Sequence, residues 1–260
     1  MEENKVNILV VDDDRRMVRT ICDILKIHGY EASDAYSGEE AAQKVRAVRF
    51  DCVLMDIKMP GAGGINALRM IKDLAPELPV ILMSAYATDE LAADAKKQGA
   101  YAVLAKPFDI QMVLSFLSLL KREESILVVD DDPLFCKTLT DILQARGCRV
   151  QSENDPSRVM DHMEEEYKLV VVLDIKLGDT NGLDVLKAIR AKYPTKPVLL
   201  VTGYGEEMTD SIKKGLQIGA YTCLYKPLPD EALINAIREI RRKKLCVVLG
   251  EAFDNAPALQ

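Results

Sequence analysis

The 260-residue sequence has few of the residues that zinc sites, disulfides and flavin sites rely on. Its two histidines, His28 and His162, argue against a histidine-rich zinc site and leave little for histidine-based catalysis. The six cysteines form no Cys-x-x-Cys pair and no metal-ligand spacing, so we expect reduced thiols in a cytoplasmic protein. There is no tryptophan and no Ser/Thr-rich phosphate cradle, which disfavours a flavin site.

Long apolar runs and an excess of positive charge are absent too. No stretch approaches the roughly 18 consecutive apolar residues that span a bilayer. The first residues, MEENKVNILVV, carry no apolar signal segment, so we expect neither membrane insertion nor secretion. A net charge of −7 does not favour binding to nucleic acid or to an anionic membrane. With 48% hydrophobic residues the chain can still bury ordinary cores, and its length suits about two domains.

The sequence repeats itself with a period of about 120 residues, which is the size of a whole domain. The run ILVVDDD at 8–14 recurs at 126–132, and Asp-Ile-Lys at 56–58 recurs at the same offset. A Gly-Ala-Tyr triplet and a Lys-Pro pair follow in both copies. We therefore predict two similar domains and a C-terminal tail, at residues 1–122, 123–245 and 246–260.

Short apolar runs alternate with longer stretches of helical periodicity in each copy. In the first copy the runs predict strands at 8–11, 52–55, 80–83 and 102–105, with a weaker one at 30–35. The periodic stretches predict helices at 15–26, 38–48, 65–74, 89–98 and 109–120. This alternation implies right-handed crossovers and a parallel sheet covered on both faces. The prediction is an α/β fold with two flavodoxin-like (βα)5 doubly wound domains, each with a five-stranded parallel sheet in the order 2-1-3-4-5.

Charged and hydroxyl side chains follow the predicted strands at the sheet edge where doubly wound domains bind ligands. In the first copy they are Asp12, Asp13, Asp56, Ser84 and Lys106; in the second they are Asp130, Asp131, Asp174, Thr202 and Lys226. Carboxylates within a few Å raise one another's pKa, and a divalent cation removes that conflict. An oxygen-rich site with few protein ligands suits Mg²⁺. Together with a lysine, Mg²⁺ can neutralise a phosphoryl group that arrives at a carboxylate.

Both copies resemble the receiver domains of two-component response regulators. The resemblance rests on an acidic pair after strand one, Asp after strand three, Ser or Thr after strand four and Lys-Pro after strand five. It covers roughly residues 5–121 and 124–245. It implies that Asp56 and Asp174 accept a phosphoryl group from a partner histidine kinase or phosphotransfer protein. No enzymatic turnover is expected beyond phosphoryl acceptance and self-dephosphorylation.

The resemblance also implies the remaining roles. In each acidic pair the second Asp is expected to bind Mg²⁺ directly and the first to hold its waters. The implied metal ligands are Asp12, Asp13, Asp56 and the Lys58 carbonyl in one copy, and Asp130, Asp131, Asp174 and the Lys176 carbonyl in the other. The phosphoryl group is expected to be held by the ammonium and hydroxyl groups of Lys106, Ser84, Lys226 and Thr202. The family's Lys-Pro peptide is usually cis.

Output is expected through protein–protein contacts with an unknown downstream protein, because the tail is too short for a DNA-binding or catalytic domain. A homodimer is one assembly that the resemblance implies. The copies depart from the family at Val103 and Cys223, where an aromatic residue is common. They differ from each other where the family often has proline, with Pro60 in one copy and Gly178 in the other.

The positions two residues past the acceptor Asp and past the hydroxyl residue are identical in the two copies. They are occupied by Lys58 and Tyr86 in the first copy and by Lys176 and Tyr204 in the second. In the family these positions modulate water access to the phosphoryl group. We therefore predict self-dephosphorylation rates that agree within about an order of magnitude, or about 1.4 kcal/mol of barrier.

Two other functions stay open at this point. Asp12-x-Asp14 superficially fits an Asp-nucleophile phosphatase of the haloacid-dehalogenase type, although that function would leave Asp56 unexplained. A pseudo-receiver scaffold that never takes phosphate is the second alternative. Asp14 and Asp132 are expected mainly to cap the first helix of each copy, where the helix dipole favours anions.

Overall fold

The computed structural model describes residues 5–61, 63–121, 124–163, 168–203 and 208–250. These residues form two units. The first contains the described residues up to Lys121 together with 245–250, and the second contains the described residues from Glu124 to Lys244. Within the described ranges, no helix combines the length and the apolar character needed to cross a membrane.

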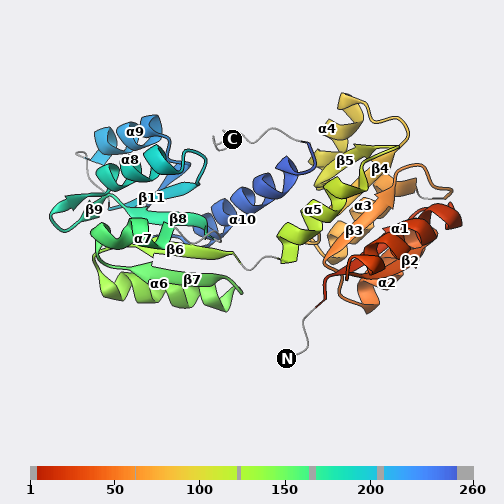
Figure 1. The fold of residues 1–260 in the computed structure, drawn as a ribbon, viewed down its shortest axis with the longest axis horizontal. Helices are drawn as coiled ribbons and strands as arrows, with labels where there is room; N and C mark the ends of the chain where they lie inside the picture. Colours follow the sequence, from red (N-terminus) through yellow and green to blue (C-terminus); the bar gives the residue numbers. More distant parts are fainter. Residues whose placement is uncertain (1–4, 62, 122–123, 164–167, 204–207, 251–260) are drawn as a thin grey trace. The chain divides into compact units, whose positions relative to one another are not determined.

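The first domain alternates strand and helix five times (Figure 1). Its strands are β1 (Asn7–Val11), β2 (Glu31–Ala35), β3 (Cys52–Asp56), β4 (Val80–Ser84) and β5 (Ala102–Ala105). Its helices are α1 (Arg15–Ile27), α2 (Gly38–Ala47), α3 (Gly63–Leu74), α4 (Asp89–Lys97) and α5 (Ile110–Lys121). All strand pairs are parallel and their order is β2-β1-β3-β4-β5, which confirms the predicted topology.

The second domain repeats this order as β7-β6-β8-β11-β12. Its parallel strands are β6 (Ser125–Val129), β7 (Arg149–Glu153), β8 (Lys168–Asp174), β11 (Val198–Thr202) and β12 (Thr222–Tyr225). Its helices are α6 (Pro133–Ala145), the 3-10 turn η1 (Pro156–Arg158), α7 (Val159–Met163), α8 (Gly182–Lys192), α9 (Met208–Ile218) and α10 (Asp230–Val247). An antiparallel hairpin, β9 (Lys176–Leu177) with β10 (Thr180–Asn181), follows β8 and was not predicted.

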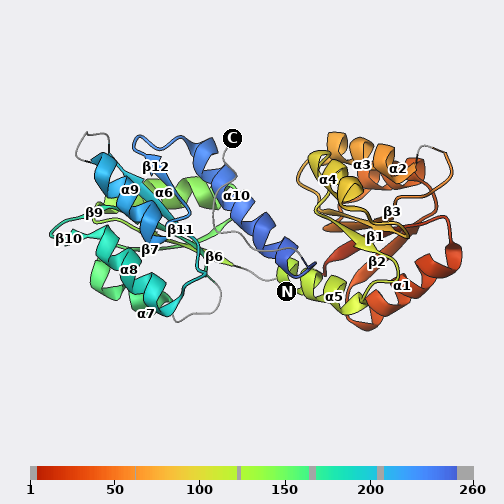
Figure 2. The same cartoon turned by 90° about the horizontal axis from the view of Figure 1, so that it is seen from above.

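Burial explains why the central strands are apolar through their middle, with polar or charged residues only at their ends. Strands β3, β4, β8 and β11 are buried along their whole length, as expected when helices cover both faces of a parallel sheet. In the first domain, α1 and α5 pack on one face and α2, α3 and α4 on the other. In the second, α6 and α10 share one face and α7, α8 and α9 the other. The layers are seen edge-on in Figure 2.

The helix starts follow the predicted capping chemistry. The carboxylate of Asp14 accepts hydrogen bonds from the backbone N–H groups of Arg16 and Met17, and that of Asp132 accepts from Leu134. Both aspartates are therefore caps, as predicted, and their oxygens are directed at the helix backbone. This leaves the first two aspartates of each Asp-Asp-Asp run for the sheet edge.

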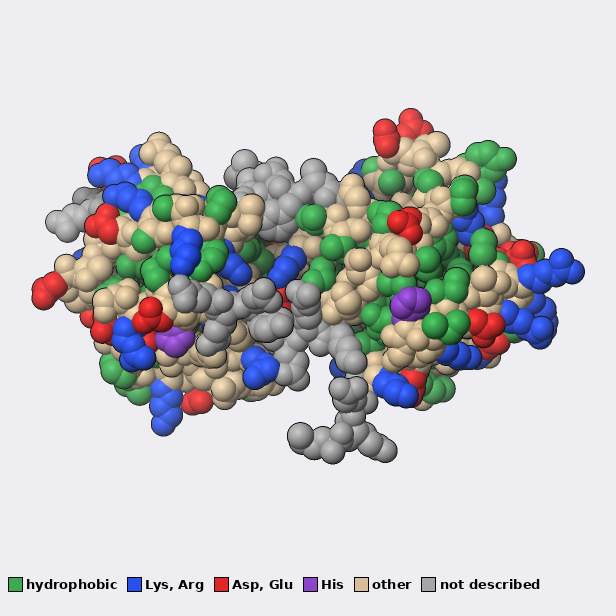
Figure 3. Space-filling model, viewed as in Figure 1, with side chains coloured by type: hydrophobic (Ala, Val, Ile, Leu, Met, Phe, Trp, Pro, Cys, Tyr) green, Lys and Arg blue, Asp and Glu red, His purple; other side chains and the backbone are tan. Residues whose placement is uncertain are grey.

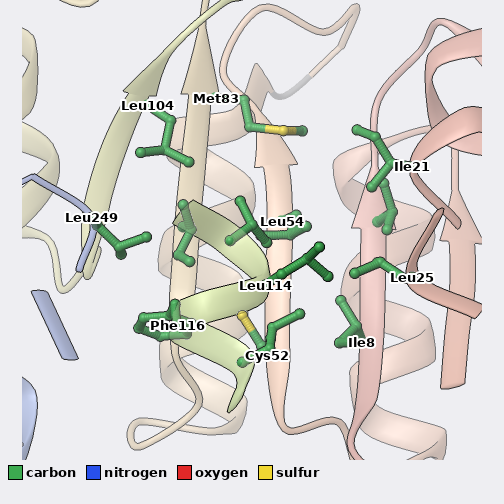
Figure 4. Packing of buried hydrophobic residues seen from close by; sticks show 14 of the residues in the cluster. Ile8, Ile21, Leu25, Cys52, Leu54, Met83, Leu104, Leu114, Phe116 and Leu249 are labelled. Carbon is green, nitrogen blue, oxygen red and sulfur yellow. The ribbon is translucent and has the colours of Figure 1, made fainter. Parts of the chain in front are cut away.

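The core of the first domain includes residues from the far end of the chain. Leu245 and Leu249 are buried with residues of β1, β3, α1 and α5. Figure 4 shows Leu249 in this cluster together with Phe116. The Cys246 thiol also donates to the backbone carbonyl of Tyr101 at 3.3 Å. The sequence analysis predicted a separate tail from residue 246 and did not anticipate this packing. Helix α10 continues past that boundary to Val247.

Charges of both signs are dispersed over the surface. On the face drawn in Figure 3, Lys and Arg side chains are interspersed with Asp and Glu side chains in each domain. This dispersion agrees with the modest net charge of −7.

Candidate functional site

The sheet order brings the predicted site residues of the first domain to one edge. Asp12 follows β1, Asp56 ends β3, Ser84 ends β4 and Lys106 follows β5, and these four strands are neighbours in the sheet. Asp12, Asp56 and Ser84 are buried. In the second domain the same edge gathers Asp130, Asp174, Thr202 and Lys226, of which the first three are buried.

Three carboxylates meet in each domain. Asp12, Asp13 and Asp56 each offer an oxygen within 4.8 Å of the others. The corresponding cluster in the second domain consists of Asp130, Asp131 and Asp174. In both clusters the middle residue is exposed and the other two are buried, so one side is open to water. Hard oxygen ligands with room for water are the donor set that Mg²⁺ prefers, and the residues present therefore fit that ion.

A lysine ammonium lies between two carboxylates in each cluster. The Nζ of Lys106 is 2.6 Å from Asp12 Oδ2 and 2.6 Å from Asp56 Oδ1. The Nζ of Lys226 is likewise 2.6 Å from Asp130 Oδ2 and 2.6 Å from Asp174 Oδ2. The side chains of the lysines are only 19% and 25% exposed, so these ion pairs are partly shielded from water.

The backbone of each lysine is fixed to the strand that carries the hydroxyl. The Lys106 N–H donates to the Ser84 carbonyl, and the Lys226 N–H donates to the Thr202 carbonyl, both at 2.7 Å. The Lys106-Pro107 and Lys226-Pro227 peptides are both cis, as the resemblance implied. The hydroxyls themselves bond locally, because Ser84 Oγ accepts from the Tyr86 N–H at 3.1 Å and Thr202 Oγ1 donates to the Gly203 carbonyl at 3.4 Å.

Burial sets the electrostatics of the first site. It raises the pKa of Asp56, and the hydrogen bond and charge of Lys106 offset this rise only in part. Burial alone would lower the pKa of Lys106, but the hydrogen bonds and charges of Asp12 and Asp56 outweigh it, so the pKa is raised. One acid of the pair that shares the ammonium therefore resists ionisation, and a bound cation would relieve that resistance.

In the second site, too, burial raises the pKa of a carboxyl group that shares the ammonium. Burial raises the pKa of Asp130, Lys226 and the Asp132 N–H oppose the rise, and the charge of Asp174 adds to it. The pKa of Lys226 is raised because its two carboxylates outweigh the effect of burial. Both sites thus hold more negative charge than one ammonium can neutralise.

The two lysines that follow the acceptor aspartates each contact the acceptor carboxylate through a backbone hydrogen bond. The ammonium of Lys58 lies 4.4 Å from the centroid of the Tyr86 ring. The backbone N–H of Lys176, the first residue of β9, donates to Asp174 Oδ1 at 3.3 Å. Their carbonyls stay predicted metal ligands, and Tyr204 lies outside the described residues.

Sequence reasoning missed two glycines that position the acceptor aspartates. A Cβ at Gly64 would lie 2.2 Å from the Asp56 carbonyl oxygen, and one at Gly182 would lie 2.0 Å from that of Asp174. Only glycine therefore lets α3 and α8 begin this close to the end of the acceptor strand. The signal was present in the sequence, because the two glycines stand at equivalent places in the two copies.

Comparisons with known proteins agree with this geometry. The family model described as "Response regulator receiver domain" matches residues 8–118 and again 126–238. The chain is similar to a response regulator receiver protein of Anaeromyxobacter sp. (strain Fw109-5), with 27% identity over 244 residues that cover 94% of this chain and 98% of that protein.

Two further similarities cover one domain. Transcriptional regulatory protein ZraR of Salmonella typhimurium is 41% identical over 109 residues, which are 42% of this chain and only 25% of ZraR. Among solved structures, the receiver domain of the Francisella response regulator 1452 is 27% identical with a TM-score of 0.43, covering 45% of this chain and 97% of that one.

Proposed function

Because the chain belongs to the response regulator receiver family, with one receiver domain in each half, we propose that both domains accept a phosphoryl group, on Asp56 and on Asp174. The observation that carries this proposal is the ammonium held 2.6 Å from two carboxylates in each domain. Such a group is already placed to meet phosphoryl oxygens next to the acceptor.

The transfer step uses the buried aspartate as nucleophile. A carboxylate oxygen of Asp56 forms a bond to phosphorus, while the bond from phosphorus to a histidine nitrogen of the donor breaks and that nitrogen keeps the electron pair. The donor is a partner histidine kinase or phosphotransfer protein. Asp174 takes the same part in the second domain.

Neutralisation of charge is the main task of the remaining side chains. The ammonium of Lys106 exchanges one of its carboxylate contacts for a contact with a phosphoryl oxygen without leaving the site, and Lys226 does the same in its own domain. The Ser84 and Thr202 hydroxyls exchange their loop partners for the phosphoryl group, which shifts the loop after β4 or β11. These shifts are the output signal, which a downstream protein reads.

The carboxylate clusters would hold Mg²⁺ through Asp13 and Asp56, with Asp12 holding waters, and through Asp131 and Asp174, with Asp130 holding waters. The carbonyls of Lys58 and Lys176 would complete the sites. Bound there, the ion supplies positive charge against which the donor phosphoryl group can approach the carboxylate. Between signals the acyl phosphate is lost by self-hydrolysis, without turnover of other substrates. We place this signalling in the cytoplasm.

Labelling with a small phosphodonor tests this function. Wild-type protein incubated with acetyl phosphate and Mg²⁺ is expected to gain acid-stable, base-labile phosphoryl groups, and EDTA is expected to prevent the gain. No labelling in either domain would favour a pseudo-receiver scaffold. Steady turnover of a general phosphoester without a retained phosphoryl group would favour a phosphatase of the haloacid-dehalogenase type. That outcome is disfavoured by Asp14, whose carboxylate caps α1.

A further inference from the structure

An aromatic ring lies against the site lysine of the second domain. The Nζ of Lys226 is 4.1 Å from the centroid of the Phe135 ring, which is well inside the range of a cation–π interaction. Phe135 is the third residue of α6 and is half-buried at the edge of the core. Its helix begins at the sheet edge where Asp130 and Asp174 lie, so the ring and the carboxylates contact the same ammonium.

We propose that Phe135 is a positioning residue that holds the Lys226 ammonium in contact with Asp130 and Asp174. The electron-rich face of the ring attracts the cation electrostatically. It takes the place of neither carboxylate, so the ammonium keeps its hydrogen bonds to Asp130 and Asp174. Lys226 is only 25% exposed, and a partly desolvated cation gains more from such a ring than one in open water. The ring therefore narrows the positions of a long and flexible side chain.

The first domain offers a matched comparison in which the equivalent position carries no ring. The residue equivalent to Phe135 is Met17, which is also half-buried on the first turn of α1. Lys106 keeps its two ion pairs at 2.6 Å, the same distances as in the second domain. The two sites thus share the arrangement of carboxylates around the ammonium and differ in the residue at this position of the first helix, which is aromatic only in the second domain. We expect Lys226 to be held more tightly than Lys106.

The contact between Phe135 and Lys226 rests on geometry alone, whereas its effect on ligand binding rests on the proposed function. The consequence is that the second domain binds a phosphoryl group, or beryllofluoride as its analogue, more strongly because its lysine is already in place. A pre-positioned side chain loses less conformational freedom when the ligand arrives.

NMR of the full chain tests the premise without any ligand. Protons held over an aromatic face are shifted upfield by the ring current, so the ε-methylene protons of Lys226 are expected upfield of those of Lys106. In Phe135→Leu they are expected to return to the Lys106 position, and in Phe135→Tyr they are expected to stay shifted. Unshifted Lys226 protons in the wild-type protein would overturn the proposal.

Beryllofluoride titration in the presence of Mg²⁺ tests the consequence. The second domain is followed in an Asp56→Asn background, where Phe135→Leu is expected to weaken binding about three- to tenfold. Phe135→Tyr, which keeps the ring, is expected to restore binding to within about twofold of the parent. The matched control is Met17→Leu in an Asp174→Asn background, where no change is expected.

The outcomes separate the two ideas. Wild-type binding in Phe135→Leu refutes the positioning role and leaves the proposed function standing. Equal losses of binding in Phe135→Leu and Phe135→Tyr also refute it. Tyrosine keeps the ring, so an equal loss would have to come from altered packing. No beryllofluoride binding by the wild-type second domain contradicts the proposed function, while the ring-current shift still decides the premise.

Discussion

In the second domain Lys176 begins the β9–β10 hairpin that follows the acceptor strand, whereas in the first domain the equivalent Lys58 belongs to no strand and its ammonium lies over the ring of Tyr86. The central geometry does not share this difference, because Lys106 and Lys226 each lie 2.6 Å from two carboxylates. The charged groups stand at strand ends that the sheet fixes. The loops around them are free to differ, so the two domains are expected to share chemistry and to differ in how it is tuned.

The two cores also differ in what completes them. The first domain buries Leu245 and Leu249 from the end of the chain. The core of the second domain, within the part of the chain described, is built from its own strands and helices. The stability of the first domain therefore depends on residues more than a hundred positions away in sequence, a dependence that its charged site does not share.

The largest expected effect tests whether the two sites are chemically equivalent. Lys106→Gln and Lys226→Gln are each expected to slow phosphorylation of their own domain about 100-fold or more, because a single preorganised charge in such sites contributes on that scale. The other domain of each variant serves as the internal control. Peptide mass spectrometry measures the phosphorylation rate of each domain. If only one of the two variants lost activity, the two sites would not be chemically equivalent.

The next effect tests the difference between the cores. Leu249 is 5% exposed, so Leu249→Ala is expected to cost the first domain about 2–3 kcal/mol of unfolding free energy and to leave the second unchanged. Hydrogen exchange measured by mass spectrometry reports the two domains separately. Leu134→Ala is the matched control, because this leucine is 72% exposed and its loss is expected to cost less than about 0.5 kcal/mol.

A third effect concerns which acid limits metal binding at low pH. Asp56 and Asp130 have raised pKa values, so each takes up a proton in the folded protein at a higher pH than in the unfolded chain. The contribution of this proton uptake to the free energy of unfolding is complete below the unfolded-state pKa, and it is lost as the pH rises through the folded-state pKa. Mg²⁺ needs the ionised form and should relieve the cost of that ionisation.

Mg²⁺ affinity is accordingly expected to rise with pH and then to level off in both domains. It should change by up to about tenfold per pH unit for each proton displaced. An NMR titration from about pH 4.5 to about pH 7.5, above the ordinary Asp value of about 3.9, measures it for each domain. An affinity that does not change with pH in a domain would show that its carboxylates are already ionised throughout.

The smallest effect tests whether the Lys58–Tyr86 contact matters. Removing the ring in Tyr86→Leu is expected to change the decay of phosphorylated Asp56 by at most about fivefold, since an exposed cation–π contact contributes about 0.5–1 kcal/mol. Tyr86→Phe keeps the ring and should behave as wild type. The wild-type decay rates of the two domains are predicted to agree within about tenfold, and a hundredfold gap would refute that prediction.

Much of the fold could be predicted from local pattern. The strand at Ala102–Ala105 has its predicted ends, and the ends of β1, β3 and β4 differ from prediction by a single residue. Buried parallel strands are apolar through their middle, and charged or hydroxyl residues stand at their carboxyl ends. For this reason Asp56 and Lys106, which are fifty residues apart, could be assigned to one site before any coordinates were known.

The features that were missed depend on contacts between distant residues or on loop geometry. Nothing near Leu249 in sequence indicates that it is buried in the core of the first domain. Phe135 is one of several apolar residues on its helix, and only the fold brings it to Lys226. The β9–β10 hairpin is two residues long on each side, too short to leave a periodic signal. The glycine at 64 was visible as a repeat, but its meaning lies in a backbone approach.

Intact-mass measurement after treatment with acetyl phosphate and Mg²⁺ tests the central claim most directly. The account predicts two added phosphoryl groups on the wild-type chain, one on Asp56→Asn, one on Asp174→Asn and none on the double variant. A wild-type chain that never carries more than one group, or a double variant that still gains one, would contradict it.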